Sequence, residues 1–251
     1  MRAAAADGHS VYLEELTWTE LRERIAGGAT TVLVPIGGTE QNGPAMVLGK
    51  HNLRVKVLAG RIASGLGDAI VAPVLAYVPE GRLDPPTAHM RFPGTITVSE
   101  PAFESVLESA ARSFRLHGFK DVVFLGDHGG YLKSVQRIAD KLNGEWRTQG
   151  TRVHAMPEYY RAFDAEYPKL LMRQGYSDAE IGTHAGLADT SLTLAVVPDA
   201  VRADRLHGKA FSAADGVHGQ PARSNVQAGQ LGADLIVERT IESIRRETAR
   251  H

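Results

Sequence analysis

The sequence of 251 residues contains no cysteine, which excludes disulfide bonds and thiolate metal ligands. It also lacks any apolar run near the roughly 20 residues that a membrane-spanning helix needs. The formal net charge is only −1, so no strongly basic surface is available for nucleic acid or an anionic membrane. We therefore expect no nucleic-acid or membrane partner and a small molecule as the substrate.

Residues 1–7 contain small residues of the kind found at signal-cleavage sites, but the apolar stretch that should precede such a site is missing. We expect a cytoplasmic protein. An exported mature form with its signal removed is the alternative, because the lack of cysteine fits a reducing or an oxidising compartment.

The order of apolar segments predicts an α/β fold. With 43% apolar and 23% charged residues, the chain can form one large domain over residues 1–251. Apolar runs typical of buried strands cover 31–36, 69–78, 121–125 and 151–156. Helical patterns cover 53–66, 100–117, 131–146 and 227–250, while 158–182 is an insertion and 190–197 is a buried helix or strand. This alternation favours three layers, α/β/α, around a mostly parallel central sheet.

The most informative stretch is Gly-Gly-Thr-Glu-Gln-Asn-Gly-Pro at 37–44, which follows the 31–36 strand. It places Glu40, and His51 beyond it, in a loop at the carboxyl end of a strand, where open α/β sheets keep their ligands. A carboxylate and an imidazole are suited to Zn²⁺, Mn²⁺ or Fe²⁺. A second glycine-rich loop, which carries Asp127 and His128, follows the 121–125 strand and should meet the first at the same edge.

The 37–44 string resembles the signature of the creatininase family of metal-dependent amidohydrolases. Further pieces follow in the family's order: His-Met-Arg-Phe-Pro-Gly-Thr at 89–95, Gly-Asp-His-Gly-Gly at 126–130, His-Ala-Gly at 184–186 with Asp-Thr-Ser at 189–191, and Gly-Val-His-Gly-Gln-Pro at 216–221. The resemblance implies the same three-layer architecture, assembled as a hexamer in many members.

The resemblance also implies a ligand set. Glu40 and His128 match family ligands, His51 stands where the family usually has an aspartate, and Asp127 stands where it more often has glycine. We expect these four residues to hold one divalent ion, most readily Zn²⁺, with Mn²⁺ or Fe²⁺ possible. Since Asn42 and Gly130 replace a histidine and a glutamate of creatininase itself, the donors suffice for one ion and are too few for two.

By the same resemblance, Asp189 is expected to be the general base and His184 the acid or oxyanion stabiliser. The competing interpretation is that Asp189 only caps the apolar segment that follows it. The residues expected near the substrate are His89, in a loop rich in proline and glycine, together with Asn42, Tyr131 and His218.

These features predict a metal-dependent hydrolase that uses metal-activated water on a small cyclic or formyl amide, at a C–N bond outside peptides. One alternative is a ring-opening hydrolase of a cyclic ketone or lactone in sugar or inositol catabolism. The other, from a different class, is a catalytically silent metal-binding protein with a structural or interaction role.

Overall fold

The computed structural model describes residues 10–206 and 210–249; the alanine-rich start at 1–7 lies outside them. Its sheet has the order β2-β1-β3-β4 and is parallel throughout. The strands are β1 (Thr31–Ile36), β2 (Ala69–Val71), β3 (Asp121–Gly126) and β4 (Arg152–Ala155). In the register of β1 and β3, Ile36 pairs with Gly126. The loops that carry Glu40 and His128 therefore leave the sheet side by side.

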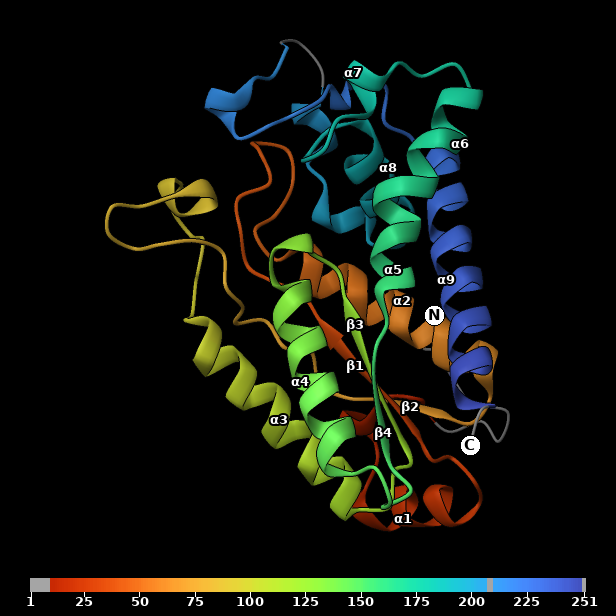
Figure 1. Ribbon diagram of the computed structural model, residues 1–251. Coiled ribbons are helices and arrows are strands. Elements are labelled where there is room, and N and C mark those ends of the chain that lie inside the picture. The colour runs from red at the N-terminus through yellow and green to blue at the C-terminus, as the bar shows by residue number, and fades with distance from the viewer. Residues whose placement is uncertain (1–9, 207–209, 250–251) are drawn as a thin grey trace.

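Helices cover both faces of this sheet (Figure 1). Alternate residues of a strand point to opposite faces, and the two hydrophobic clusters follow this rule. Val34 and Phe124 belong to the cluster with α3 (Glu100–Leu116) and α4 (Leu132–Glu145). Leu33 and Val123 belong to the cluster with α2 (Lys50–Leu66) and α9 (Val226–Thr248). The predicted three-layer α/β/α fold is confirmed.

Local capping explains several helix boundaries. Thr17 forms a capping box with Glu20 at the start of α1 (Trp18–Ala26), Ser99 caps α3, and Asn225 caps α9. The remaining helices form the region beyond the carboxyl ends of the strands: α5 (Pro157–Arg161), a π-helical turn (Ala162–Glu166), α6 (Tyr167–Arg173), α7 (Asp178–Ile181) and α8 (Leu187–Val196).

Three expectations about local structure need correction or completion. The strand expected over 69–78 ends at Val71, shortly before Pro73, which has no N–H for a ladder; Leu75 touches Ile36 only as an isolated bridge. The helix expected from 53 begins at Lys50, so His51 lies in its first turn and not in a loop. The segment 190–197 is part of a helix.

The organisation of the chain as one domain stays a prediction. Within the described residues, no helix is long and apolar enough to cross a bilayer.

Candidate metal centre and active site

The site is built around Glu40, whose side chain is fully buried at the carboxyl end of β1. The chain reaches it through Gly38, where φ is +149° and a Cβ would lie 2.5 Å from Oε1 of Glu80. Only glycine fits that backbone and that approach. Oε1 of Glu40 receives a hydrogen bond, whereas Oε2 is buried without one.

His51 joins two carboxylates. Its Nε2 lies 2.8 Å from Oε1 of Glu40 and its Nδ1 lies 2.6 Å from Oδ2 of Asp127. Both ring nitrogens of His51 therefore lie within hydrogen-bonding distance of a carboxylate oxygen. Tyr159 donates to the other oxygen of Asp127 at 2.8 Å.

Arg54 and Lys50, both on α2 with His51, continue these contacts to Asp189. Arg54 donates to Oδ2 of Asp127 from Nε at 3.0 Å and to Oδ1 of Asp189 at 2.7 Å. Nζ of Lys50 lies 2.5 Å from Oδ2 of Asp189 and 3.8 Å from Oε1 of Glu40. The contacts close a ring, which we call the charge ring: Glu40, His51, Asp127, Arg54, Asp189 and Lys50.

Acidic and basic groups alternate around the charge ring, and every member is buried. Burial alone would raise the pKa of Asp127, but the charge of Arg54 and the hydrogen bond from His51 hold that pKa below its ordinary value. Burial likewise opposes ionisation of Asp189, whose pKa is nevertheless held low by Lys50 and Arg54. The carboxylates are therefore charged, and their charges are compensated within the protein.

Three histidines outside the charge ring lie close to the carboxylate of Glu40. Nε2 of His89 lies 3.2 Å from Oε2 of Glu40, Nε2 of His128 lies 3.7 Å from the same atom, and Nδ1 of His184 lies 3.7 Å from Oε1. Burial lowers the pKa of His128 to about 4 and that of His184 to about 3, and it also lowers that of His89. These imidazoles are neutral near pH 7, as metal ligands must be.

Glu80 brings a further carboxylate to the same place. It lies in the loop after β2 and is 4% exposed, with Oε2 at 3.7 Å from Nδ1 of His128. Burial, together with the nearby charge of Glu40, raises the pKa of Glu80 to about 9.

The expected ligands are thus brought together, but in two different settings. Glu40 and His128 belong to the cluster of possible metal donors. Its donor atoms lie within 4.8 Å of one another in two groups: Glu40 with His89 and His184, and Glu40 with Glu80 and His128. His51 and Asp127 lie in the charge ring, where hydrogen bonds occupy both nitrogens of one and both oxygens of the other. Their ligand roles stay predictions.

The two residues expected to be catalytic, His184 and Asp189, also lie in different surroundings. His184 lies at the Glu40 cluster, with Nε2 2.9 Å from the carbonyl oxygen of Gln41. Asp189 accepts from Lys50, from Arg54 and from the backbone N–H of Ala185 at 3.0 Å. Its role as general base stays a prediction.

The residues expected near the substrate differ in accessibility. His89 is partly exposed beside Glu40, and His218 is exposed, with its backbone paired to His184. Asn42 is buried and donates to the carbonyl oxygens of Glu40 and Val47. Tyr131 is buried, and its hydroxyl binds backbone groups at the ends of β1 and β3, so it positions the two loops.

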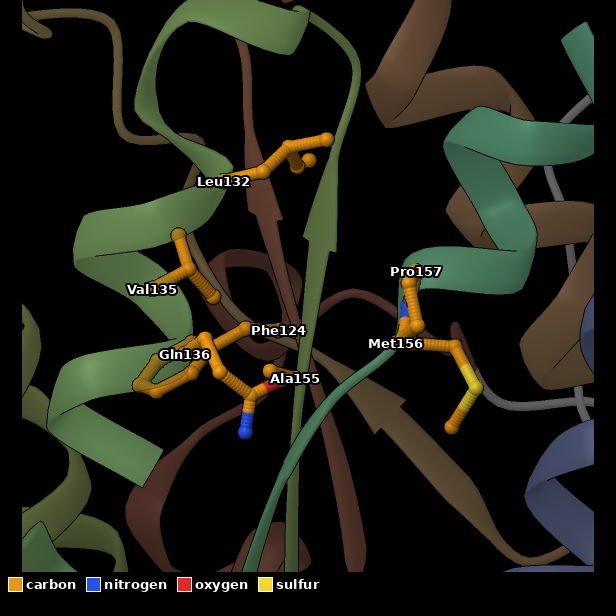
Figure 2. A pocket seen from close by; sticks show the side chains of 8 residues that line it. Phe124, Leu132, Val135, Gln136, Ala155, Met156 and Pro157 are labelled. Atoms are coloured by element: carbon orange, nitrogen blue, oxygen red, sulfur yellow. The ribbon is translucent and has the colours of Figure 1, made fainter. Parts of the chain in front are cut away.

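A separate small pocket lies between α4 and the segment after β4 (Figure 2). Leu132 and Val135 lie on one side of it and Met156 and Pro157 on the other, with the Met156 side chain directed away from α4. Its volume is about 30 Å³, and its lining contains no charged or histidine side chain. It is a packing gap and contributes nothing to the candidate site.

Sequence reasoning missed Lys50, Arg54, Glu80 and Tyr159. Charged residues in an amphipathic helix are normally assigned to its solvated face, and Glu80 lies in a loop with no spacing pattern. One signal was available: Lys50, His51 and Arg54 follow directly on the loop of Glu40, within one turn of helix.

Comparison with known proteins identifies the family. The family model described as creatininase, creatinine amidohydrolase, matches residues 14–244. The chain belongs to the creatininase family. The resemblance seen in the sequence is therefore confirmed.

Curated relatives of this creatininase-family chain have different activities. It is 28% identical over 200 residues to a creatinine amidohydrolase of Pseudomonas putida, covering 78% of the chain and 76% of the relative. It is 31% identical over 180 residues to a mycofactocin precursor peptide peptidase of Mycolicibacterium smegmatis, covering 70% of the chain and 61% of the relative. A 3-dehydro-scyllo-inosose hydrolase of Thermotoga maritima is 26% identical over 200 residues, 75% of the chain and 57% of the relative.

Solved structures support the fold and the class of cofactor. A creatininase structure described as a manganese form is 26% identical, with a TM-score of 0.77 over 95% of this chain and 98% of that one. A creatininase variant described as a Zn-Zn type has a TM-score of 0.74 at 24% identity, over 95% of this chain and 98% of that one, and supports the fold. The manganese form supports a divalent metal as the class of cofactor.

The residues of this chain fit such a metal. Oε2 of Glu40 is buried without a hydrogen bond, and neutral imidazoles face it. Carboxylate oxygen and imidazole nitrogen are the donors that Zn²⁺, Mn²⁺ and Fe²⁺ accept.

Proposed function

We propose that this protein is a metal-dependent hydrolase of a C–N bond in a small cyclic or formyl amide. The observation that carries the proposal is the free Oε2 of Glu40, buried opposite the neutral imidazoles of His89, His128 and His184. The creatinine amidohydrolase and the peptide peptidase among its relatives support amide chemistry.

Glu40 and His128 would hold the metal, with His89 and His184 beside it. We propose one ion per chain, Zn²⁺ before Mn²⁺ or Fe²⁺, because the charge ring uses the donors of His51 and Asp127. When bound, such an ion polarises a carbonyl and lowers the pKa of its water to about 7.

The protein's own residues position this chemistry. His51 and Lys50 hold Glu40 from one side, so that only Oε2 is free. His184 is proposed as the acid or oxyanion stabiliser, and its neutral, partly accessible ring suits donation of a hydrogen bond to a developing oxyanion. Asp189 is proposed as the base. Lys50 links it to Glu40, because Nζ of Lys50 contacts the carboxylates of both residues.

A second candidate is ring opening of a cyclic ketone or lactone. It is favoured by the Thermotoga maritima hydrolase among the relatives. The two reactions differ in their products, since amide hydrolysis forms a carboxylate and an amino group (a guanidino group from creatinine), whereas lactone hydrolysis forms a carboxylate and a hydroxyl group.

The test compares metal-loaded and metal-free protein on lactams, including creatinine, on formamides, short peptides and lactones. Acid and amine are measured separately, and Glu40→Gln serves as the inactive control. New amino or guanidino groups whose formation depends on metal and on Glu40 support the proposal, and acid formed from a lactone without such groups supports ring opening. No turnover on any substrate by fully loaded protein would favour the silent metal-binding alternative.

A homo-oligomer, hexameric as in many family members, is also proposed. It is supported by Tyr77 and Leu83, which are 65% and 72% exposed before and within the loop at 79–97. Light scattering after size exclusion would measure the assembly. The cytoplasmic location stays a prediction, to be checked by fractionation of cells that make the protein.

A further inference from the structure

We propose that Glu80 is a ligand of the metal, completing a site with Glu40 and His128. The inference rests on the proposed function, because it names a residue of that same metal centre. No sequence signal points to Glu80, and the structure alone brings it to Glu40.

The first argument is the lack of hydrogen bonds. Among the described residues, the buried side-chain atoms without a hydrogen-bond partner are Oε2 of Glu40, Oδ1 of Asn42, and both oxygens of Glu80. A buried carboxyl group without partners costs free energy. Two such groups that face one neutral imidazole are the donor set of a cation site.

The second argument is convergence. The donor atoms of Glu40, Glu80 and His128 lie within 4.8 Å of one another, with His128 at 3.7 Å from each carboxylate. Two oxygens and one imidazole nitrogen leave positions open on a divalent ion for water and substrate, as catalytic sites require.

The third argument is that the backbone is shaped to admit Glu80. Gly38 leaves room for Oε1 of Glu80, and a Cβ at Gly130 would lie 2.9 Å from the His128 ring and 3.7 Å from the carbonyl oxygen of Pro79. The N–H of Glu80 donates to the hydroxyl of Thr97 at 3.0 Å. The side chain is therefore positioned in advance by its loop.

The charge ring explains why Glu80 is needed. The donor atoms of His51 and Asp127 are occupied by hydrogen bonds within the ring. The ring therefore offers no third ligand for a metal ion held by Glu40 and His128. Glu80 approaches from the loop after β2, and its oxygens accept no hydrogen bond from another group of the described residues.

The test is Glu80→Gln, with Glu238→Gln as the matched control on the exposed face of α9. Zn²⁺ and Mn²⁺ affinities are measured by calorimetry, and Tm is measured in EDTA and with metal. We expect the variant to lose more than about tenfold in metal affinity. About tenfold is the smallest loss typical of residues that only support a metal ligand, so a direct ligand should cost more. We also expect its Tm in EDTA to be no lower than that of the wild type, and its Tm increase with metal to be lost.

If the wild-type protein binds metal and the Glu80→Gln variant binds it with the same affinity, this inference is overturned and the proposed function is not. Wild-type protein that binds no metal would overturn the proposed function with it. Should Glu80→Gln fail to fold, Glu80→His in the Co²⁺ form replaces an oxygen donor by nitrogen. A changed visible spectrum supports ligation, and an unchanged one contradicts it.

Discussion

His51 lies between Glu40 and Asp127, with its two ring nitrogens 2.8 Å and 2.6 Å from their carboxylate oxygens. The position follows from α2, which begins at Lys50 and so turns the side chain back into the site. This contact fixes which oxygen of Glu40 stays free. It also begins the charge ring, on which the stability and the metal site of this protein both depend.

Lys50→Met should destabilise the protein strongly. The Lys50 and Asp189 side chains are 1% and 6% exposed, and removing one partner of a buried pair leaves an uncompensated charge, a loss of about 3–5 kcal/mol. Lys56→Met is the control on the same helix, since the pair of Lys56 with Glu14 is exposed and worth about 1 kcal/mol at most. Urea unfolding in EDTA measures both; equal losses would mean that the charge ring is not formed.

Tyr159→Phe should cost more than Tyr167→Phe, although both hydroxyls are buried. Tyr159 donates to the carboxylate of Asp127 at 2.8 Å, and Tyr167 donates to the carbonyl of Ala228 at 3.0 Å. Hydrogen bonds to charged groups contribute about 1.5–3 kcal/mol, and neutral ones about 0.5–1.5 kcal/mol. The free energies of unfolding should rank in that order, and the reverse order would speak against an ionised Asp127.

Stability of the metal-free protein should fall as the pH decreases from 6.5 to about 4. Burial lowers the pKa of His128 from 6.5 to about 4 in the folded protein, so the unfolded chain binds more protons in this interval and is favoured by acid. The contribution is complete above pH 6.5 and lost as the pH falls through the folded value. His128→Asn should flatten the Tm profile measured in EDTA, whereas the exposed His117→Asn should not; identical slopes for both variants would contradict the assignment.

Much of the fold could be predicted because it depends on local patterns. The apolar runs at 31–36 and 121–125 and the helical pattern over 100–117 gave the correct elements. The end of β2 was placed too late, because the apolar run continues to Val78 although Pro73 has no N–H for a ladder.

The site was predictable only in part. Glu40, His128 and His184 stand in motifs, and the parallel register brings them together. The burial of Lys50, Arg54 and Glu80 depends on tertiary contacts among segments far apart in the chain, for which neither periodicity nor spacing gives a signal. His51 lies in the charge ring because α2 begins at Lys50, three residues before the start that the apolar pattern indicates.

Asp189→Asn separates two roles of Asp189. As a general base, its loss should lower kcat by about 10²-fold or more while metal content stays at the wild-type level. As a member of the charge ring, its loss also lowers Tm, so stability alone does not decide. An unchanged kcat in folded, metal-loaded protein would restrict Asp189 to holding Lys50 and Arg54.

The most direct measurement is the number of metal ions bound per chain. Protein stripped with chelator is reloaded with Zn²⁺ or Mn²⁺, separated from free metal, and analysed by plasma mass spectrometry beside Glu40→Gln. The free Oε2 of Glu40 and the occupied donors of the charge ring predict one ion per wild-type chain and none in the variant. Two ions per chain, or a Glu40→Gln variant that keeps its metal, would contradict the account.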